Sequence, residues 1–158
     1  MAAEKTKDSQ VQNKIERYCA FQERCRQEVR HKLRQLGVED DSHDKIIAQL
    51  QKKGFINEAR YAKAFAHDQF NLHHWGKVKI SLSLHGKNVP EKFIDDALAE
   101  IDTRQYESVL KSLMKKKERE LNDTPDEFIK NNRLANYLTS KGFEPELIWQ
   151  LIESAKKK

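Results

Sequence analysis

The sequence predicts an all-α fold, an elongated array of three helical repeats rather than a sphere. Glycine and proline residues stand where helices are expected to begin or end. Four glycines follow apolar-periodic runs and three prolines stand where a first helical turn is expected: Gly37, Gly54, Gly86 and Gly142, and Pro90, Pro125 and Pro145. No segment has convincing strand character, so no sheet is expected.

Three segments of the chain resemble one another. Each ends in a glycine-containing pair after a helical run: residues 32–38 (KLRQLGV), 81–87 (SLSLHGK) and 137–143 (YLTSKGF). Each is followed by an acidic or proline-started run that holds two adjacent apolar residues, at positions 46–47, 93–94 and 147–148. This recurrence predicts a helical repeat array, and such arrays usually bind rather than catalyse.

Four helices are expected in the first part of the chain, over residues 11–22, 26–36, 42–53 and 58–70. Their apolar residues recur at helical spacing, as Val29, Leu33 and Leu36 do in the second. Cys25 stands at the N-cap of that helix with Glu28 at its N3 position, which is a capping-box arrangement with a weak cap. Asn57 caps the fourth helix.

Five more helices are expected in the second part. They cover residues 76–85, 90–101, a segment that starts after residue 102 or 103, a segment that starts near residue 124, and residues 145–155. Val78 and Leu82 alternate as in a strand, but the repeat register favours a helix there. The sequence Thr124-Pro125-Asp126-Glu127 predicts a capping box with proline at the first helical position.

These helices divide into a disordered tail and three repeats. The predicted boundaries are residues 1–10 for the tail, 11–71 for an N-terminal helix plus the first repeat, 72–122 for the second, and 123–158 for the third with its basic C-terminal tail. No loop is expected to exceed about six residues. The closing Lys156-Lys157-Lys158 is interpreted as a solvated tail.

Composition and charge restrict the function classes. The chain has 158 residues, of which 37% are hydrophobic and 35% charged, and it carries a net charge of +5. This moderate basicity permits contact with nucleic acid or with an acidic protein surface. No apolar stretch approaches the roughly 20 residues that a membrane span needs. Cys19 and Cys25 lack metal-site spacing, so we expect a cytoplasmic, reduced protein with no membrane contact.

No catalytic motif is present in the sequence. There is no phosphate-binding glycine loop, no GxSxG, no HExxH and no paired-cysteine zinc frame. The helix N-terminus and the flanking Arg24 and Arg26 favour a lowered pKa for Cys25, but no partner residue makes it a nucleophile. His73-His74 is interpreted as a surface pair. We therefore expect no enzyme, no metal site and no cofactor.

Three basic clusters are the candidate binding residues for a protein partner or DNA. The first occupies the second helix: Arg24, Arg26, Arg30, Lys32 and Arg34. The second lies in residues 75–90, where no acidic residue occurs: Trp75, Lys77, Lys79 and Lys87. The third cluster is diluted by Glu118 and Glu120, and a solvated helix face explains it equally well: Lys111, Lys115, Lys116, Lys117 and Arg119. Of these, Lys115, Lys116 and Lys117 are candidate binding residues. Because the first two occupy corresponding helices of successive repeats, we expect them to line one surface.

With the helices placed, the chain resembles the RecX family of bacterial regulatory proteins. The similar stretches are residues 24–33 (RCRQEVRHKL), 53–65 (KGFINEARYAKAF), 75–80 (WGKVKI) followed by 84–86 (LHG), and 137–143 (YLTSKGF) preceded by Arg133-Leu134. Four such stretches in order are specific, and the resemblance covers residues from about 14 to 153. Two departures are Cys25 in place of a serine cap and His85 in place of a lysine or arginine.

The resemblance implies three tandem three-helix repeats in an elongated, curved molecule. It also implies a monomeric, non-enzymatic modulator that binds the RecA–DNA filament. Such a protein would suppress RecA recombinase, ATPase and coprotease activities and so regulate DNA repair, with DNA contacted directly or through the filament.

Two alternatives from other classes stay open. One is a helical protein that binds nucleic acid directly, and its affinity would fall steeply with salt whether or not RecA is present. The other is a helical scaffold for an acidic protein partner. Dependence on salt and on assembled RecA separates the three hypotheses.

Overall fold

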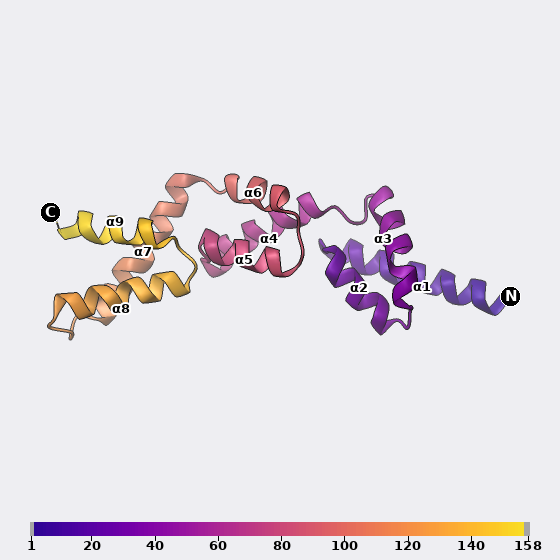
Figure 1. Ribbon diagram of the computed structural model, residues 1–158, viewed down its shortest axis with the longest axis horizontal. Helices are drawn as coiled ribbons and strands as arrows, with labels where there is room; N and C mark the ends of the chain where they lie inside the picture. Colours follow the sequence, from indigo (N-terminus) through magenta and orange to yellow (C-terminus); the bar gives the residue numbers. More distant parts are fainter. Residues whose placement is uncertain (1, 157–158) are drawn as a thin grey trace.

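The computed structural model describes residues 2–156, with side chains from Asp8 onward. Over that range it contains nine α-helices, one 3-10 turn and no strand. The helices lie in an elongated row that runs from the N-terminus at one end to the C-terminus at the other (Figure 1). The all-α prediction is confirmed.

The helices form three successive three-helix units. The first unit holds α1 (Ala2–Phe21), α2 (Arg26–Gln35) and α3 (His43–Lys52), with the 3-10 turn η1 (Asp40–Ser42) before α3. The second holds α4 (Glu58–His73), α5 (Lys77–Gly86) and α6 (Glu91–Ala99). The third holds α7 (Thr103–Glu120), α8 (Glu127–Ser140) and α9 (Pro145–Lys156).

The unit boundaries differ from the predicted ones by one helix. Helix α4 packs on α5 and α6, and α7 packs on α8. The boundaries predicted after residues 71 and 122 therefore placed α4 and α7 in the preceding repeat. An amphipathic pattern shows which face of a helix is apolar, but it does not show which neighbour covers that face. The three similar glycine-ended segments nevertheless lie at equivalent places, at the ends of α2, α5 and α8.

The two chain ends also differ from expectation. Helix α1 begins at Ala2, so residues 2–10 are helical where the sequence predicted a disordered tail. Alanine, glutamate, lysine and glutamine favour helix, and no glycine or proline interrupts this segment. Of the basic C-terminal tail, Lys156 ends α9, whereas Lys157 and Lys158 lie outside the described residues.

The buried apolar side chains form two hydrophobic cores. One lies inside the first unit and includes Ile15, Val29, Leu33 and Leu50. The other is continuous through the second and third units, from Tyr61 on α4 to Ile152 on α9. Cys25, the N-cap of α2, is fully buried in this second core. The first unit is therefore attached to the second through the start of α2.

Three of the four predicted C-terminal glycines have the expected backbone. Their φ angles are positive: Gly37, Gly54 and Gly142. Gly86 instead lies inside α5, and Asn88, with φ 61°, takes the left-handed position beyond the helix. Asparagine tolerates that conformation better than most residues. At α8 the predicted Thr124-Pro125 start is also wrong, because the Asp126 side chain caps the helix by accepting from the Phe128 and Ile129 amides.

The second and third units meet through direct backbone contact. The amide of Gly76 donates to the carbonyl of Lys141 at 2.8 Å, and the amide of Val78 donates to the carbonyl of Gly142 at 2.9 Å. A Cβ atom on Gly76 would lie 2.3 Å from the carbonyl carbon of Gly142. Only glycine permits this approach. Gly76 therefore determines where α5 begins relative to the end of α8.

Tyr106 of α7 links the two sides of this joint through its hydroxyl group. Its hydroxyl oxygen accepts a hydrogen bond from the Lys77 amide at 3.0 Å, and its O–H donates to the Glu144 carboxylate. Its ring packs against Phe70 and Phe143, with centroids 5.7 Å and 5.2 Å away. Burial, and next the bond to Glu144, raise the pKa of Tyr106 above its ordinary value, so the phenol stays protonated.

The first and second units are joined by polar contacts around the start of α2. Arg26 pairs with Glu58 of α4, whose side chain is only 5% exposed, and Arg60 of α4 pairs with Glu23. The amide of Cys25 donates to Glu28 at 3.3 Å, which confirms the Glu28 half of the capping box. A buried carboxylate needs such a partner, so Arg26 is required by the fold itself.

The lowered pKa expected for Cys25 is wrong. Burial raises the pKa of this thiol to about 11, and burial likewise raises that of Cys19 to about 11. At Cys25 the loss of hydration disfavours the thiolate more than the hydrogen bond from the Glu28 backbone and the charge of Lys87 favour it. Both cysteines therefore serve as small apolar core residues.

A first prediction concerns the joint at Gly142, where φ is 98° and a Cβ atom would lie 2.2 Å from the Cβ of Lys79. Gly142→Ala should lower the free energy of unfolding by about 2 kcal/mol or more, because the substitution adds both backbone strain and overlap. Denaturant unfolding followed by circular dichroism measures it.

The matched control is Gly86→Ala, since Gly86 is helical and a Cβ atom there meets nothing within 4 Å. That change should raise stability by about 0.5–1 kcal/mol. Equal unfolding midpoints for the Gly142→Ala variant and the parent would contradict the described joint.

A second prediction concerns the two thiols. Because both are buried and have raised pKa values, a thiol-specific aromatic disulfide reagent at neutral pH should modify the native protein at least about a hundredfold more slowly than the denatured protein. Rapid modification of either cysteine in the native protein would show that α1 or the start of α2 is packed differently.

Candidate functional site

The arginines of the first cluster are largely paired within the molecule. Arg30 of α2 pairs with Asp44 of α3, and Arg34 donates to Asp40 at 3.0 Å. That hydrogen bond has the largest influence on the Asp40 carboxyl group, and it lowers the pKa of that group. With Arg26 held by Glu58, replacing these arginines by glutamate would set like charges together and disturb the fold.

The other two members of the first cluster pack on one aromatic ring. The guanidinium carbon of Arg24 lies 3.8 Å from the centre of the Tyr18 ring, and the ammonium of Lys32 lies 5.5 Å from it. The Nε of Arg24 also donates to the Tyr18 carbonyl at 3.1 Å. The sequence did not single out Tyr18, although a tyrosine near basic residues is a common cation–π partner.

The lysines of the second cluster lie over aromatic rings and have no acidic partner among the described residues. Their ammonium nitrogens are 4.9 Å from the Tyr106 ring for Lys77, 4.4 Å from the Trp75 ring for Lys79 and 5.8 Å from the Phe65 ring for Lys87. None of the ion pairs among the described residues involves them. A ring holds the ammonium in place without neutralising its charge.

Trp75 has a structural role as well as a place in this cluster. Its ring is half-buried and meets Phe65 edge to face, with centroids 6.3 Å apart. It thereby forms a base on which Lys79 rests. The interpretation of Trp75 as a packing residue and its assignment to the basic surface are therefore compatible.

The structure brings two residues of the first cluster and one of the second together at one hollow. Arg26 and Arg30 of α2 and Lys87, just after α5, line a shallow hollow with Gln27 and Asn88. Lys77 and Lys79 lie nearer the joint with the third unit, at the start of α5. Three of the nine residues predicted for these two clusters thus share a hollow, and the rest are distributed along the row.

The third cluster is separate and divided. Lys115 and Lys116 of α7 are exposed, whereas Lys117 pairs with Glu120 at 3.2 Å and lies 4.8 Å from the Tyr137 ring. Lys115 lines a different hollow with the basic residues Arg104 and Lys111. Arg104 was not among the predicted binding residues. The spacing of residues 104, 111 and 115 on one face of α7 could have indicated it.

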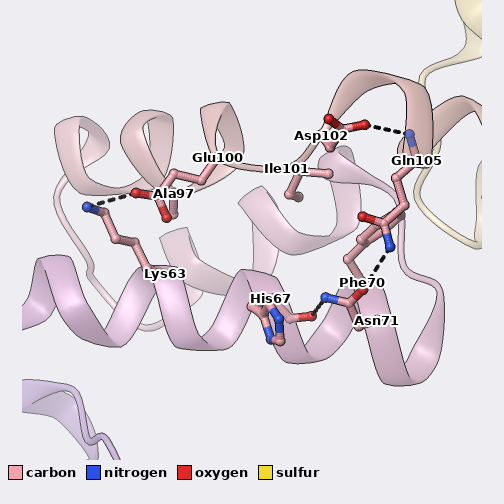
Figure 2. Close-up of a pocket in the computed structure, with 9 residues that line it drawn as sticks. All are labelled: Lys63, His67, Phe70, Asn71, Ala97, Glu100, Ile101, Asp102 and Gln105. Carbon is pink, nitrogen blue, oxygen red and sulfur yellow. Dashed lines mark hydrogen bonds and ion pairs between the residues drawn. The ribbon is translucent and has the colours of Figure 1, made fainter.

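The pocket between α4 and the α6–α7 connection offers few free polar groups. It has a volume of 310 Å³ and a floor of Phe70, Ala97 and Ile101. Figure 2 shows that its rim is paired internally: Lys63 with Glu100 at 3.0 Å, and the Gln105 amide group with Asn71 at 3.4 Å. The basic surfaces are therefore better candidates for function than this pocket.

In the part of the chain that the structure covers, no helix combines the length and apolarity that crossing a bilayer would require.

Comparison with known families matches two consecutive segments of the chain. The model of the first three-helix domain of RecX matches residues 13–55, and that of its second three-helix domain matches residues 57–98. The second segment coincides with α4–α6, and the first runs from within α1 to just past the end of α3. Together the two models cover more than half of the chain.

Curated relatives carry the same name. Regulatory protein RecX of Clostridium beijerinckii is 33% identical over 127 residues, which are 80% of this chain and 59% of that protein. Regulatory protein RecX of Prosthecochloris aestuarii is 24% identical over 136 residues, 86% of this chain and 87% of that protein. The chain spans about 60% of the length of the clostridial relatives.

Solved structures show the same arrangement of helices. The crystal structure of RecX from Lactobacillus salivarius superposes with a TM-score of 0.83 at 25% identity, covering 97% of this chain and 99% of that one. A second RecX crystal structure has a TM-score of 0.83 at 22% identity and supports the fold. The two consecutive domain models, with the fold match, show that the chain belongs to the RecX family of regulatory proteins.

Proposed function

We propose that this chain binds the RecA filament assembled on DNA and inhibits RecA recombinase, ATPase and coprotease activities, as a non-enzymatic monomer in the cytoplasm. The observation that carries the proposal is the group of three lysines around α5, whose ammonium groups have no acidic partner among the described residues. Family membership supplies the regulatory context.

The positions of these lysines favour binding over internal stabilisation. Their side chains are half-buried against aromatic rings, so their ammonium groups are already held in place before any partner arrives. Ordering a long side chain on binding costs about 0.5–1.5 kcal/mol, and that cost is reduced here. Acidic side chains of RecA or DNA phosphates would then meet fixed positive charges.

The first cluster contributes less free charge to this surface. Arg26 and Arg30 adjoin Lys87 in one hollow, but each already has a carboxylate partner. We propose that they extend the surface toward the first unit and set its shape, while the lysines supply most of the unpaired charge.

A third prediction tests this surface. Replacing Lys77, Lys79 and Lys87 together by alanine should weaken inhibition of the RecA–single-stranded-DNA ATPase on the order of tenfold, because each exposed contact contributes about 0.2–1 kcal/mol and the three contributions add. The measurement is the protein concentration that halves ATP hydrolysis.

The control variant removes the same total charge elsewhere, with Lys45, Lys52 and Lys92 replaced by alanine; all three are exposed and outside the ion pairs of the described residues. It should inhibit like the parent at matched helicity. Equal inhibition by both triple variants across a salt series would place the binding surface away from α5.

A second candidate function is direct binding of nucleic acid. The row of Arg104, Lys111 and Lys115 along α7 favours it, because these residues line one open hollow in which Glu107 is the single acid. Phosphate contacts of this kind should produce RecA-independent affinity for labelled DNA that falls steeply with salt. Binding that instead requires assembled RecA would exclude this candidate.

A further inference from the structure

A separate basic hollow lies on the first unit, between α1 and α2. Its volume is 340 Å³, and four cationic side chains contribute to its wall: Lys14, Arg17, Arg24 and Lys32. Among the described residues, no carboxylate lines it. A group of cations around one hollow without a carboxylate in its wall favours an anionic partner.

The rest of the wall is apolar. It consists of Tyr18 and Phe21 from α1 and Leu36 from the end of α2. Phe21 is 82% exposed, the largest exposure among the big apolar side chains of the described residues. The Phe21 ring lies in water beside the hollow. A partner that covers it makes the free energy of binding more favourable by about 25 cal/mol per Å² of apolar surface buried.

Helical spacing places the free charges beside this ring. Lys14, Arg17 and Phe21 stand at positions i, i+3 and i+7 of α1, and therefore on one face of the helix. Arg24 is fixed differently, by its stacking on Tyr18 at 3.8 Å and by an ion pair with Glu28 at 3.8 Å. The wall thus combines a preformed Arg24–Tyr18 stack with three cations, Lys14, Arg17 and Lys32, that have no ion-pair partner among the described residues.

We propose that this hollow binds an acidic peptide segment of a partner protein through a short apolar anchor of one or two residues. The anchor packs against Phe21, Leu36 and the edge of Tyr18, and carboxylates on either side of it meet Lys14, Arg17 and Lys32. This division follows the usual anatomy of an interface, with an apolar centre and a charged rim.

The occupied face of Tyr18 argues against a nucleic-acid strand here. Single strands bind to aromatic faces on which bases stack, but the Arg24 guanidinium already covers the Tyr18 ring. Only Phe21 offers an open face, and its neighbours Leu36 and Tyr18 present further apolar surface rather than donors to base edges. An apolar side chain flanked by carboxylates matches this wall better.

This site is independent of the proposed function. Its lysines and arginines lie on α1, on α2 and in the connection between them, whereas the lysines proposed to meet the filament lie around α5. A test without RecA therefore leaves the RecA proposal untouched whatever its result.

The test uses a dye-labelled peptide of aspartate and glutamate with a central Phe-Leu pair, titrated with the full chain and followed by fluorescence anisotropy. Phe21→Ala should weaken binding about fivefold or more, as loss of an interface anchor does. Replacing the central pair of the peptide by alanine should have a similar effect. Charge reversal of Lys14 and Arg17 should weaken binding further and reduce its salt dependence.

Two matched controls keep the result specific. Phe128→Ala removes a ring that is 77% exposed on α8, far along the chain from the hollow, and should leave peptide binding unchanged. Reversal of Lys45 and Lys52 on α3 should reduce affinity less than reversal of Lys14 and Arg17. No saturable peptide binding, or equal losses in the Phe21 and Phe128 variants, would overturn the proposal. An oligothymidine of equal charge that binds more tightly and depends on Phe21 would assign the hollow to nucleic acid instead.

Discussion

The close approach of Gly76 to Gly142 is the contact on which the arrangement of the second and third units depends. Two backbone hydrogen bonds cross this point, from Gly76 to Lys141 and from Val78 to Gly142. Any side chain on either glycine would overlap backbone or the start of the Lys79 side chain. Because backbone atoms form the joint directly, its geometry tolerates little variation, and the buried Tyr106 hydroxyl fixes it further through Lys77 and Glu144.

This joint also determines where the basic surface lies. Helix α5 starts at Lys77, one residue after Gly76, so the contact that fixes the third unit fixes the first turn of α5 as well. Lys77 then lies over Tyr106 and Lys79 over Trp75. At the other end of α5, Lys87 lies over Phe65 and beside Arg26 and Arg30 of the first unit. Packing residues and charged residues are therefore interleaved, and the fold holds the charges without neutralising them.

Much of the fold could be predicted from the sequence, because helix ends leave local signals. Gly37, Gly54 and Gly142 have the positive φ expected of them, and the side chain of the predicted cap Asn57 accepts a hydrogen bond from the Arg60 amide. The errors arose where the decision was not local. Asn88 replaced Gly86 as the left-handed residue, and α4 and α7 joined the following units because their apolar faces are covered by helices later in the chain. The candidate site was predicted as a set of basic residues, but composition could not show that Arg26, Arg30 and Arg34 are paired. Nor could it show that Lys77, Lys79 and Lys87 have no ion-pair partner among the described residues. Ion pairing between helices, whether within a unit or across two units, depends on tertiary structure.

The most direct measurement of the central claim is lysine footprinting of the protein bound to RecA filaments on single-stranded DNA. An acylating reagent modifies accessible ammonium groups, and mass spectrometry reports the extent at each lysine. The account predicts that modification of Lys77, Lys79 and Lys87 falls several-fold on binding, while Lys45 and Lys52 of α3 react as in the free protein. Undiminished modification of Lys77, Lys79 and Lys87 in a complex that still inhibits RecA would contradict the account.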